Sequence, residues 1–265
     1  MKNALFLISA FLLSLALFQS CAKKESDSAT VATAEDLAAQ TGLSDQIDLA
    51  ANIAIEERGG GGACPVVTLD KPWGTWPNTL TIDYGPDGCA GPNGTNILKG
   101  KLIISQTADA FTKGATRTLT FDNFFIDAIK VEGTQSWTNN GLNASAQWSF
   151  TKTSQGMKVS YPDGTSASWD LNYTSTITQG GLTLTWWDDV WSTTGNISGI
   201  NREGVHYSAT TSAPLIKKAT CGWVSEGVID LVVGGNTATI DYGDGSCDNK
   251  APVTLPNGDS CTIKL

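Results

Sequence analysis

The chain has 265 residues and a formal net charge of −9, and only 16% of its residues are charged. Nucleic acids and anionic lipids attract basic surfaces, so an acidic chain without a basic patch excludes them as expected partners. From residue 64 onward Thr, Ser, Asn and Gly abound, with Val, Ile and Trp placed among them in alternation. This composition is typical of antiparallel sheets joined by turns.

Residues 1–20 have the pattern of an export signal. Lys2 gives a positive start, and fourteen mostly apolar residues follow from Ala4 to Leu17. Such a run suits the core of a signal peptide and is too short for a transmembrane helix, which needs ~20 residues. No later apolar run approaches this length, so we expect no membrane-spanning segment in the mature chain.

The apolar run ends in Phe18-Gln19-Ser20-Cys21, which resembles the lipobox of bacterial lipoproteins, although Gln19 replaces the usual small residue. We expect Cys21 to carry palmitate-type acyl chains that hold the protein on the lipid bilayer, since each buried CH₂ contributes ~0.8 kcal/mol. Simple secretion with an ordinary thiol is the alternative. The charged residues after Cys21 resemble surface-export signals, so an outer-membrane lipoprotein, exposed at the cell surface, is expected.

Residues 21–63 are predicted to be a lipidated tether. The segment Ala22–Ser28 is too poor in apolar groups to fold by itself. A helix is predicted from Thr33 to Glu57, and its apolar residues share one narrow face: Leu43, Ile47, Ala50 and Ala54. Gly59–Gly62 are expected to act as a swivel between this tether and the domain that begins at Cys64.

Residues 64–265 are predicted to form a single all-β domain. Apolar and polar residues alternate, as in strands with one buried face, over residues 146–151, 169–173, 182–186 and 261–265. Pro-Asp-Gly, Pro-Asn-Gly and Asn-Gly turns separate such runs. Typical strand lengths then give roughly twelve to fourteen strands in an antiparallel meander. Because this array has to bury its apolar face, a β-sandwich or a curved, partly rolled sheet is expected.

A short sequence occurs twice, each time between two cysteines. Residues 81–85 and 239–243 both read Thr-Ile-Asp-Tyr-Gly, and the flanking cysteines lie at matched offsets. In an exported protein these offsets predict two disulfides: Cys64–Cys89 and Cys221–Cys247. Zinc binding is the alternative, but the chain has no Cys-x-x-Cys pair. Cys261 is left over, and we expect a buried free thiol there, with re-pairing to Cys247 as the alternative.

Several motifs resemble those of a family of uncharacterised all-β lipoproteins from Gram-negative bacteria, marked by paired cysteine hairpins. The run Asp241–Asn249 resembles the family signature most closely. Further matching segments lie at 89–94, 121–124, 131–134, 188–191 and 199–205. The resemblance covers essentially all of 64–265 and implies an all-β envelope protein, with no established activity to carry over. Cys261 falls where the family pattern has another residue.

The domain lacks the residue sets of common catalytic sites. Its single histidine, His206, is expected on a strand, on the face opposite Val205 and Tyr207, and no nucleophile-elbow motif accompanies it. A glycosidase needs two positioned carboxylates. The adjacent pair Asp188–Asp189 is expected in a turn, and the domain has three glutamates: Glu132, Glu203 and Glu226. We therefore expect a non-catalytic protein without a cofactor that binds an extracellular ligand or serves structurally. A polysaccharide-acting hydrolase that uses paired carboxylates is the alternative.

Nine tryptophans suggest a binding role, because exposed aromatic rings stack on ligands. Trp148, Trp169 and Trp186 share strand faces with apolar residues, which favours core packing. Four others fit a core less well and are the candidate ligand-binding residues, for a glycan or an extracellular protein: Trp73, Trp76, Trp187 and Trp191. No metal site is predicted, because turn-forming Asp and Gly explain the acidic run from Asp241 without calcium.

Overall fold

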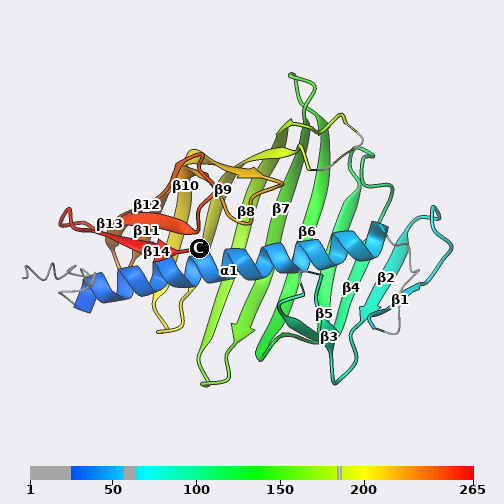
Figure 1. Ribbon diagram of the computed structural model, residues 1–265, viewed down its shortest axis with the longest axis horizontal. Coiled ribbons are helices and arrows are strands. Elements are labelled where there is room, and N and C mark those ends of the chain that lie inside the picture. Colours follow the sequence, from blue (N-terminus) through cyan, green and yellow to red (C-terminus); the bar gives the residue numbers. More distant parts are fainter. Residues whose placement is uncertain (1–24, 57–63, 93, 184, 186) are drawn as a thin grey trace, which may run out of the picture.

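The computed structural model describes residues 25–56, 64–92, 94–183, 185 and 187–265. Figure 1 shows one long helix, α1, lying across a broad β-sheet. The expected signal peptide, the lipidation site at Cys21 and the Gly59–Gly62 swivel lie outside the described residues. Within the described part, no helix combines the length and apolar character that crossing a membrane requires.

Fourteen strands form one antiparallel sheet, in agreement with the predicted meander. They follow one another in chain order, except that β3 pairs beside the path with β4. The strands are β1 (Val66–Leu69), β2 (Asn78–Asp83), β3 (Cys89–Ala90), β4 (Ile97–Gln106), β5 (Thr116–Ile126), β6 (Ile129–Leu142), β7 (Trp148–Ser160), β8 (Ser166–Gln179), β9 (Val190–Ile200), β10 (His206–Lys218), β11 (Glu226–Val233), β12 (Asn236–Asp244), β13 (Lys250–Thr254) and β14 (Ser260–Lys264). Since β1 and β14 are separate edges, the sheet is open.

Glycine bulges curve this sheet into a trough. The strand register shifts at Gly100, Gly133 and Gly227, whose φ angles are 75°, 115° and 114°. A side chain would not fit at Gly100, since an added Cβ would lie 1.9 Å from the Asn123 carbonyl oxygen. Bulges bend a strand and increase its twist. Of the two expected architectures, the structure is therefore the curved, partly rolled sheet.

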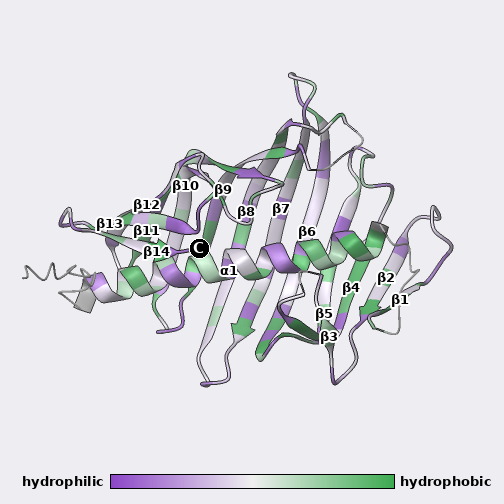
Figure 2. Ribbon diagram, viewed as in Figure 1, coloured by the Kyte–Doolittle hydropathy of each residue, from purple (hydrophilic) through white to green (hydrophobic). Residues whose placement is uncertain are grey.

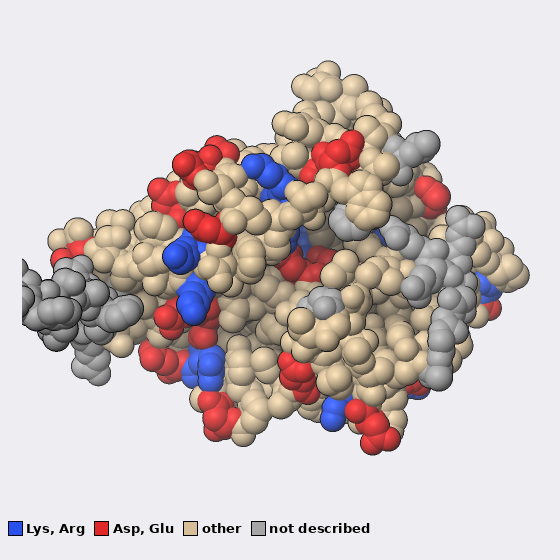
Figure 3. Space-filling view, in the orientation of Figure 1, with Lys and Arg blue, Asp and Glu red and all other residues tan. Residues whose placement is uncertain are grey.

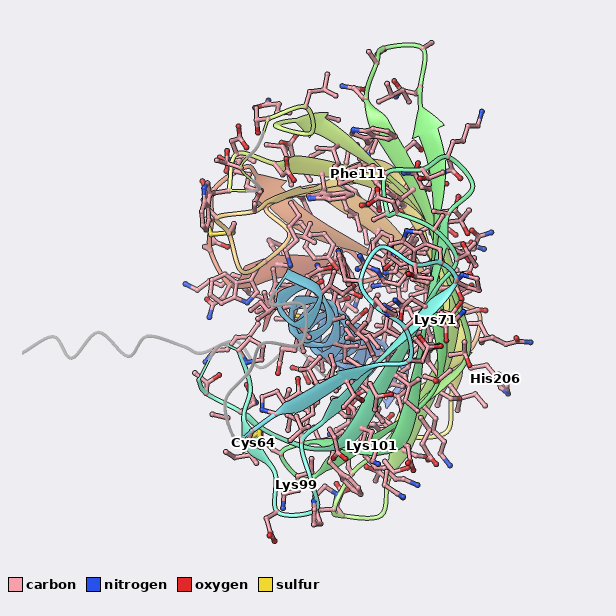
Figure 4. The ribbon with its side chains drawn as sticks, turned by 90° about the vertical axis from the view of Figure 1, so that its right-hand side faces the viewer. Cys64, Lys71, Lys99, Lys101, Phe111 and His206 are labelled. Carbon is pink, nitrogen blue, oxygen red and sulfur yellow. A yellow bond between two sulfur atoms is a disulfide. The ribbon has the colours of Figure 1, made fainter. Side chains whose placement is uncertain are left out.

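Helix α1 (Glu25–Glu56) fills the concave face of the sheet (Figures 1 and 4). It has 32 residues and begins earlier than the predicted Thr33. The four residues of the predicted apolar face are all buried, and Ala34, Leu37 and Ala51 widen that face. Figure 2 shows hydrophobic residues on the strands behind the helix. Over 25–56 the chain thus differs from a free tether, because the curved sheet offers an apolar surface that the sequence alone does not reveal.

Polar contacts fix the position of α1 along the trough. Each joins a helix residue to a strand or turn far away in the sequence: Thr33 to Asn201, Asp36 to the Arg202 backbone, Gln40 to Tyr207, Ser44 to Gln135 and Asn52 to Arg117. Two ion pairs, Asp45–Lys217 and Asp48–Lys152, lie in the middle of the helix. These contacts join α1 to strands in both halves of the sheet, so they define one position of the helix along the trough.

The two predicted disulfides are confirmed. Cys64–Cys89 and Cys221–Cys247 join Cα atoms 6.0 and 5.7 Å apart. Both copies of the repeated sequence form the same turn, in which an aspartate accepts a hydrogen bond from the backbone N–H two residues later: Asp83 from Gly85 and Asp241 from Gly243.

Both expectations for Cys261 are wrong. Cys261 is disulfide-bonded, so it is not a free thiol, and its partner is not Cys247, which pairs with Cys221. Strand pairing places Cys261 opposite Val253. That placement depends on how the last hairpin folds onto the sheet, which the spacing of cysteines in the sequence does not indicate.

One predicted strand is also wrong. Leu182, Thr183 and Thr185 lie in the connection between β8 and β9, where Leu182 is 72% exposed, while positions 184 and 186 lie outside the described residues. The preceding Gly180 has φ 82°, a left-handed conformation that turns the chain out of the sheet before the alternating residues begin. The other three predicted segments overlap β7, β8 and β14.

Candidate functional site

Six connections of the sheet meet at one end of the molecule. In an antiparallel meander every second connection returns to the same end. These connections are residues 70–77, 107–115, 143–147, 180–189, 219–225 and 245–249, and together they are called the loop end below. In Figure 1 they lie along the upper margin of the sheet.

Large exposed apolar side chains gather at this loop end. Six of the ten that the described residues contain lie in its connections or at the adjoining strand end: Trp73, Phe111, Leu142, Leu182, Trp187 and Trp223. Five of the six connections contribute, counting Leu142, the last residue of β6, with the turn that follows it. Single exposed apolar residues are ordinary, but their recurrence at one end is typical of an interaction surface.

Four aromatic rings pack together beneath the loop end, and we call them the aromatic cluster: Phe111, Trp148, Phe150 and Trp191. The Phe111 ring lies 5.1 Å from Trp148 and 6.5 Å from Phe150 between centroids, and Phe150 lies 5.7 Å from Trp191. Phe111 is 54% exposed and the other three are half-buried. In Figure 4 Phe111 lies on the α1 side of the sheet, above the helix.

A buried asparagine holds Phe111 over the sheet. The Asn139 side-chain amide donates a 2.8 Å hydrogen bond to the Ala110 carbonyl, and its oxygen accepts one from the Gly141 N–H. The Asn139 backbone carbonyl also accepts a 2.7 Å bond from the Gly114 N–H. These bonds tie both sides of the connection 107–115 to β6, so Phe111 is positioned by the scaffold rather than by its own loop.

Strands β8 and β9 provide the floor beside the rings. Ser175 lies opposite Phe150 on one side and opposite Thr193 on the other, and the two hydroxyls are 2.8 Å apart. Ile177, which is buried, lies opposite Trp191. The rings therefore stand on a rigid surface that contains both apolar and hydroxyl groups.

Helix α1 borders the cluster with paired charges. The Lys152 ammonium group lies 2.7 Å from Asp48, donates to Ser44 at 2.7 Å and lies 4.9 Å from the centre of the Trp137 ring. Lys217, on β10, pairs with Asp45 of the helix. Both of these lysines are thus paired with carboxylates, while Arg117 of β5 donates a 2.7 Å hydrogen bond to the neutral side chain of Asn52.

Two neighbouring carboxylates lie in the connection between β8 and β9. The Asp188 side chain accepts hydrogen bonds from the hydroxyls of Thr183 and Thr185, at 3.0 and 3.2 Å. Burial raises the pKa of the Asp189 carboxyl, and the charge of Asp188 raises it further. As the sequence suggests, the pair lies before β9 rather than within a strand.

The four candidate tryptophans all lie at the loop end, in two places. Trp73 and Trp76 share the connection 70–77, with ring centroids 5.8 Å apart in an edge-to-face arrangement. Trp187 is 58% exposed in the connection after β8, and Trp191 belongs to the aromatic cluster. Sequence reasoning missed Phe111 and assigned Trp148 to the core. The sequence feature that could have indicated an exposed Phe111 is its position as the single aromatic residue in the short, partly polar run Asp109–Lys113.

His206 lies on the opposite side of the sheet (Figure 4), as expected from the burial of Tyr207. It borders a shallow depression of about 300 Å³ together with Ser168, Asp170 and Ser198. Among the described residues His206 forms no side-chain hydrogen bond, and Asp170 instead accepts one from the Gly156 N–H at 2.6 Å. A Ser–His–Asp relay is therefore not assembled there.

The acidic run from Asp241 binds its own backbone. Asp244 accepts hydrogen bonds from the Ser246 backbone and hydroxyl, and Asp248 accepts one from the Lys250 N–H. Across the part of the chain that the structure describes, no three His, Cys, Asp or Glu side chains converge in a way that could hold a metal ion.

Comparison with known proteins finds no family model, no curated protein and no solved structure that matches this chain. The site is therefore interpreted from its own chemistry. On the face seen in Figure 3, Lys and Arg side chains are interspersed with Asp and Glu instead of forming one basic patch. Aromatic rings, hydroxyls and paired charges are what the loop end offers a ligand.

Proposed function

We propose that this chain is a non-catalytic lipoprotein of the outer membrane that binds an extracellular ligand at its loop end. The observation that carries the proposal is the aromatic cluster, with its exposed Phe111 ring fixed on a rigid sheet. Aromatic groups on a preordered scaffold lose little conformational entropy on binding and dominate many recognition surfaces.

The lipid anchor supports a position close to the bilayer. If Cys21 is acylated, three residues separate it from the first residue of α1, Glu25. An extended chain spans at most ~3.5 Å per residue, so the helix begins within roughly 15 Å of the lipidated cysteine. Because α1 is packed into the sheet, the whole domain would then stand directly at the membrane surface.

A polysaccharide-acting hydrolase remains the competing function, and one observation favours it. Asp188 and Asp189 are adjacent, and the raised pKa of Asp189 is a property expected of a general acid. The pair lies beside Trp187, near the aromatic cluster. Against this, Asp188 is engaged by two threonine hydroxyls, which is typical of a turn that stabilises itself.

Binding is tested with the full chain carrying Cys21→Ser, exported and purified without detergent, on arrays of glycans and extracellular matrix proteins. Phe111→Ala should weaken binding about tenfold, equivalent to about 1.4 kcal/mol, because one stacking ring is lost. Phe125→Ala is the matched control, since Phe125 is half-buried on the opposite face near the other end of the sheet. Absence of any ligand that distinguishes the two variants would contradict the proposal.

Catalysis is tested on the same protein by measuring new reducing ends in soluble polysaccharides. We expect no turnover above that of a heat-denatured sample. Turnover that either Asp188→Asn or Asp189→Asn abolishes would establish the hydrolase and overturn the non-catalytic function.

A further inference from the structure

We infer, on the basis of the proposed function, that the ligand is an uncharged polysaccharide chain that lies against the aromatic cluster. Four observations support this ligand class: the ring arrangement, the hydroxyl and amide groups beside the rings, the excess of carboxylates, and the helix that fills the trough below. The last two disfavour competing ligands, a polyanion and an acyl chain.

The rings form a continuous apolar wall across several strands. Phe111 comes from the connection after β4, Trp148 and Phe150 from β7, and Trp191 from β9. Successive centroids are 5.1 to 6.5 Å apart, a spacing comparable with the width of one sugar ring. The C–H groups on a sugar face carry small positive partial charges, which suit the negative face of an aromatic ring. A repeating chain of sugar rings can therefore contact several aromatic residues in succession.

Hydroxyl and amide groups surround this wall. Thr183 and Thr185 lie with Asp188 in the connection after β8, and Asn143 and Gln147 lie in the turn after β6. Sugars present both donors and acceptors at their edges, and mixed hydroxyl and amide side chains can match either.

The charges of the site disfavour a polyanion. Lys152 and Lys217 are each paired with a carboxylate of α1. Asp188 and Asp189 add negative charge at the rim, and the chain as a whole carries −9. The six connections of the loop end contain five aspartates and two lysines, Lys71 and Lys113, so an acidic polysaccharide would meet net repulsion here.

The helix disfavours an acyl chain. A lipid tail needs an enclosed apolar space, and the apolar trough of this sheet is occupied by the buried side chains of α1, including Leu37 and Ile47. The aromatic cluster, in contrast, is open, with Phe111 more than half exposed. An open row of rings suits a rigid chain that keeps much of its surface in water.

The inference is tested by affinity electrophoresis of the Cys21→Ser chain in native gels. Uncharged gels contain laminarin, galactomannan, dextran or soluble starch, and charged gels contain alginate or polygalacturonate. We expect retardation in at least one uncharged gel, unchanged when salt is raised to screen charges. Phe111→Ala and Trp191→Ala should each raise the dissociation constant at least tenfold. Phe111→Tyr, which keeps a ring, should retain binding. Phe125→Ala should match the parent protein.

The outcomes separate this inference from the proposed function. Retardation only in charged gels, or a protein ligand on the array that depends on Phe111 without any retardation, would overturn the uncharged polysaccharide while leaving the binding function. No ligand of any class affected by Phe111→Ala would overturn both. Thermal unfolding of each variant shows whether the domain is intact, and Phe111→Tyr supplies a second comparison if Phe111→Ala unfolds.

Discussion

At the scale of single residues, the site depends on side chains whose surroundings change their ordinary behaviour. Asn139 is buried, and its side-chain amide donates a hydrogen bond to the Ala110 carbonyl in the connection 107–115. This polar residue inside a strand therefore positions Phe111. Lys152 is similarly buried, with its charge balanced by Asp48. Buried polar groups of this kind are tolerated only when their hydrogen bonds are satisfied.

Asp189 gives a prediction that is specific to pH. Its pKa is raised in the folded protein, so the folded state disfavours the charged form relative to the unfolded state. The neutral carboxyl therefore contributes stability that is present below the unfolded pKa and is lost as pH rises through the folded pKa. Asp189→Asn should stabilise the protein near neutral pH and have little effect at pH 3.

Urea unfolding of the parent and Asp189→Asn proteins across this pH range measures the difference. Asp188→Asn is a useful comparison because it removes the neighbouring charge and should partly reproduce the effect at neutral pH. A stability difference that does not depend on pH would contradict the raised pKa of Asp189.

At the scale of elements, α1 is part of the hydrophobic core. It has one glycine, no proline and many alanines, a composition that favours a helix, and the small side chains let its backbone approach the sheet. The sheet in turn needs the helix, because its concave face carries buried residues from strands at both ends, such as Ile82 and Ile263. A domain that starts at Cys64 would expose this face to water.

Two substitutions in α1 distinguish a docked helix from a tether. Ile47→Ala, at a residue that is 2% exposed, should destabilise the protein by about 3 kcal/mol because it leaves a cavity in the core. Leu49→Ala, at a residue that is 37% exposed, should change stability by less than ~0.5 kcal/mol. Chemical denaturation with the full chain measures both values. Equal and small effects would mean that the helix does not pack on the sheet in solution.

At the scale of the whole molecule, the proposed anchor at Cys21 would set the orientation of the fold on the membrane. The start of α1 lies beside the turn between β13 and β14, where the Asn257 amide donates a 3.5 Å hydrogen bond to Asp27. Figure 1 shows the β1–β2 edge at the opposite end of the helix. A lipid on Cys21 would therefore bring the β13–β14 edge to the bilayer and leave the β1–β2 edge further away.

Acylation itself is checked by fractionation and by mass. The parent protein should partition into the outer membrane, and Cys21→Ser should appear in the soluble fraction. The N-terminal peptide of the mature parent should carry acyl chains on a thioether sulfur. The sequence has six cysteines, and outside the two disulfides Cys64–Cys89 and Cys221–Cys247 only Cys21 and Cys261 are left. A thioether sulfur cannot also form a disulfide, so acylation of Cys21 requires that Cys261 is not joined to it in the mature protein. Non-reducing peptide mapping that finds Cys21 joined to Cys261 would contradict acylation.

The orientation is checked by fluorescence quenching in vesicles that contain nitroxide-labelled lipids. A fluorophore is attached through Asn257→Cys or, at the far edge, through Thr75→Cys, both at exposed positions in turns. If Cys21 is lipidated as proposed, we expect stronger quenching at position 257, because Cys21 precedes the first residue of α1 by only a few residues. Equal quenching at both positions would indicate that the domain moves freely on a longer tether.

Much of this architecture follows from the sequence by itself. Period-two alternation and the Pro-Asp-Gly and Asn-Gly turns fix the antiparallel meander, because side-chain direction and turn geometry are local properties. The matched offsets of the cysteines around Asp83 and Asp241 are likewise local, and both disulfides form as predicted. The exposure of Trp187 and the turn at Asp188 also follow from nearby residues.

Only the tertiary structure decided the rest, because it depends on contacts between distant segments. The curvature of the sheet turns a polar-looking N-terminal segment into a buried helix, and no local pattern encodes the surface it packs on. Phe111 joins Trp148, Phe150 and Trp191 because a meander returns every second connection to the same end. The disulfide bonding of Cys261 is likewise not indicated by the spacing of the cysteines in the sequence.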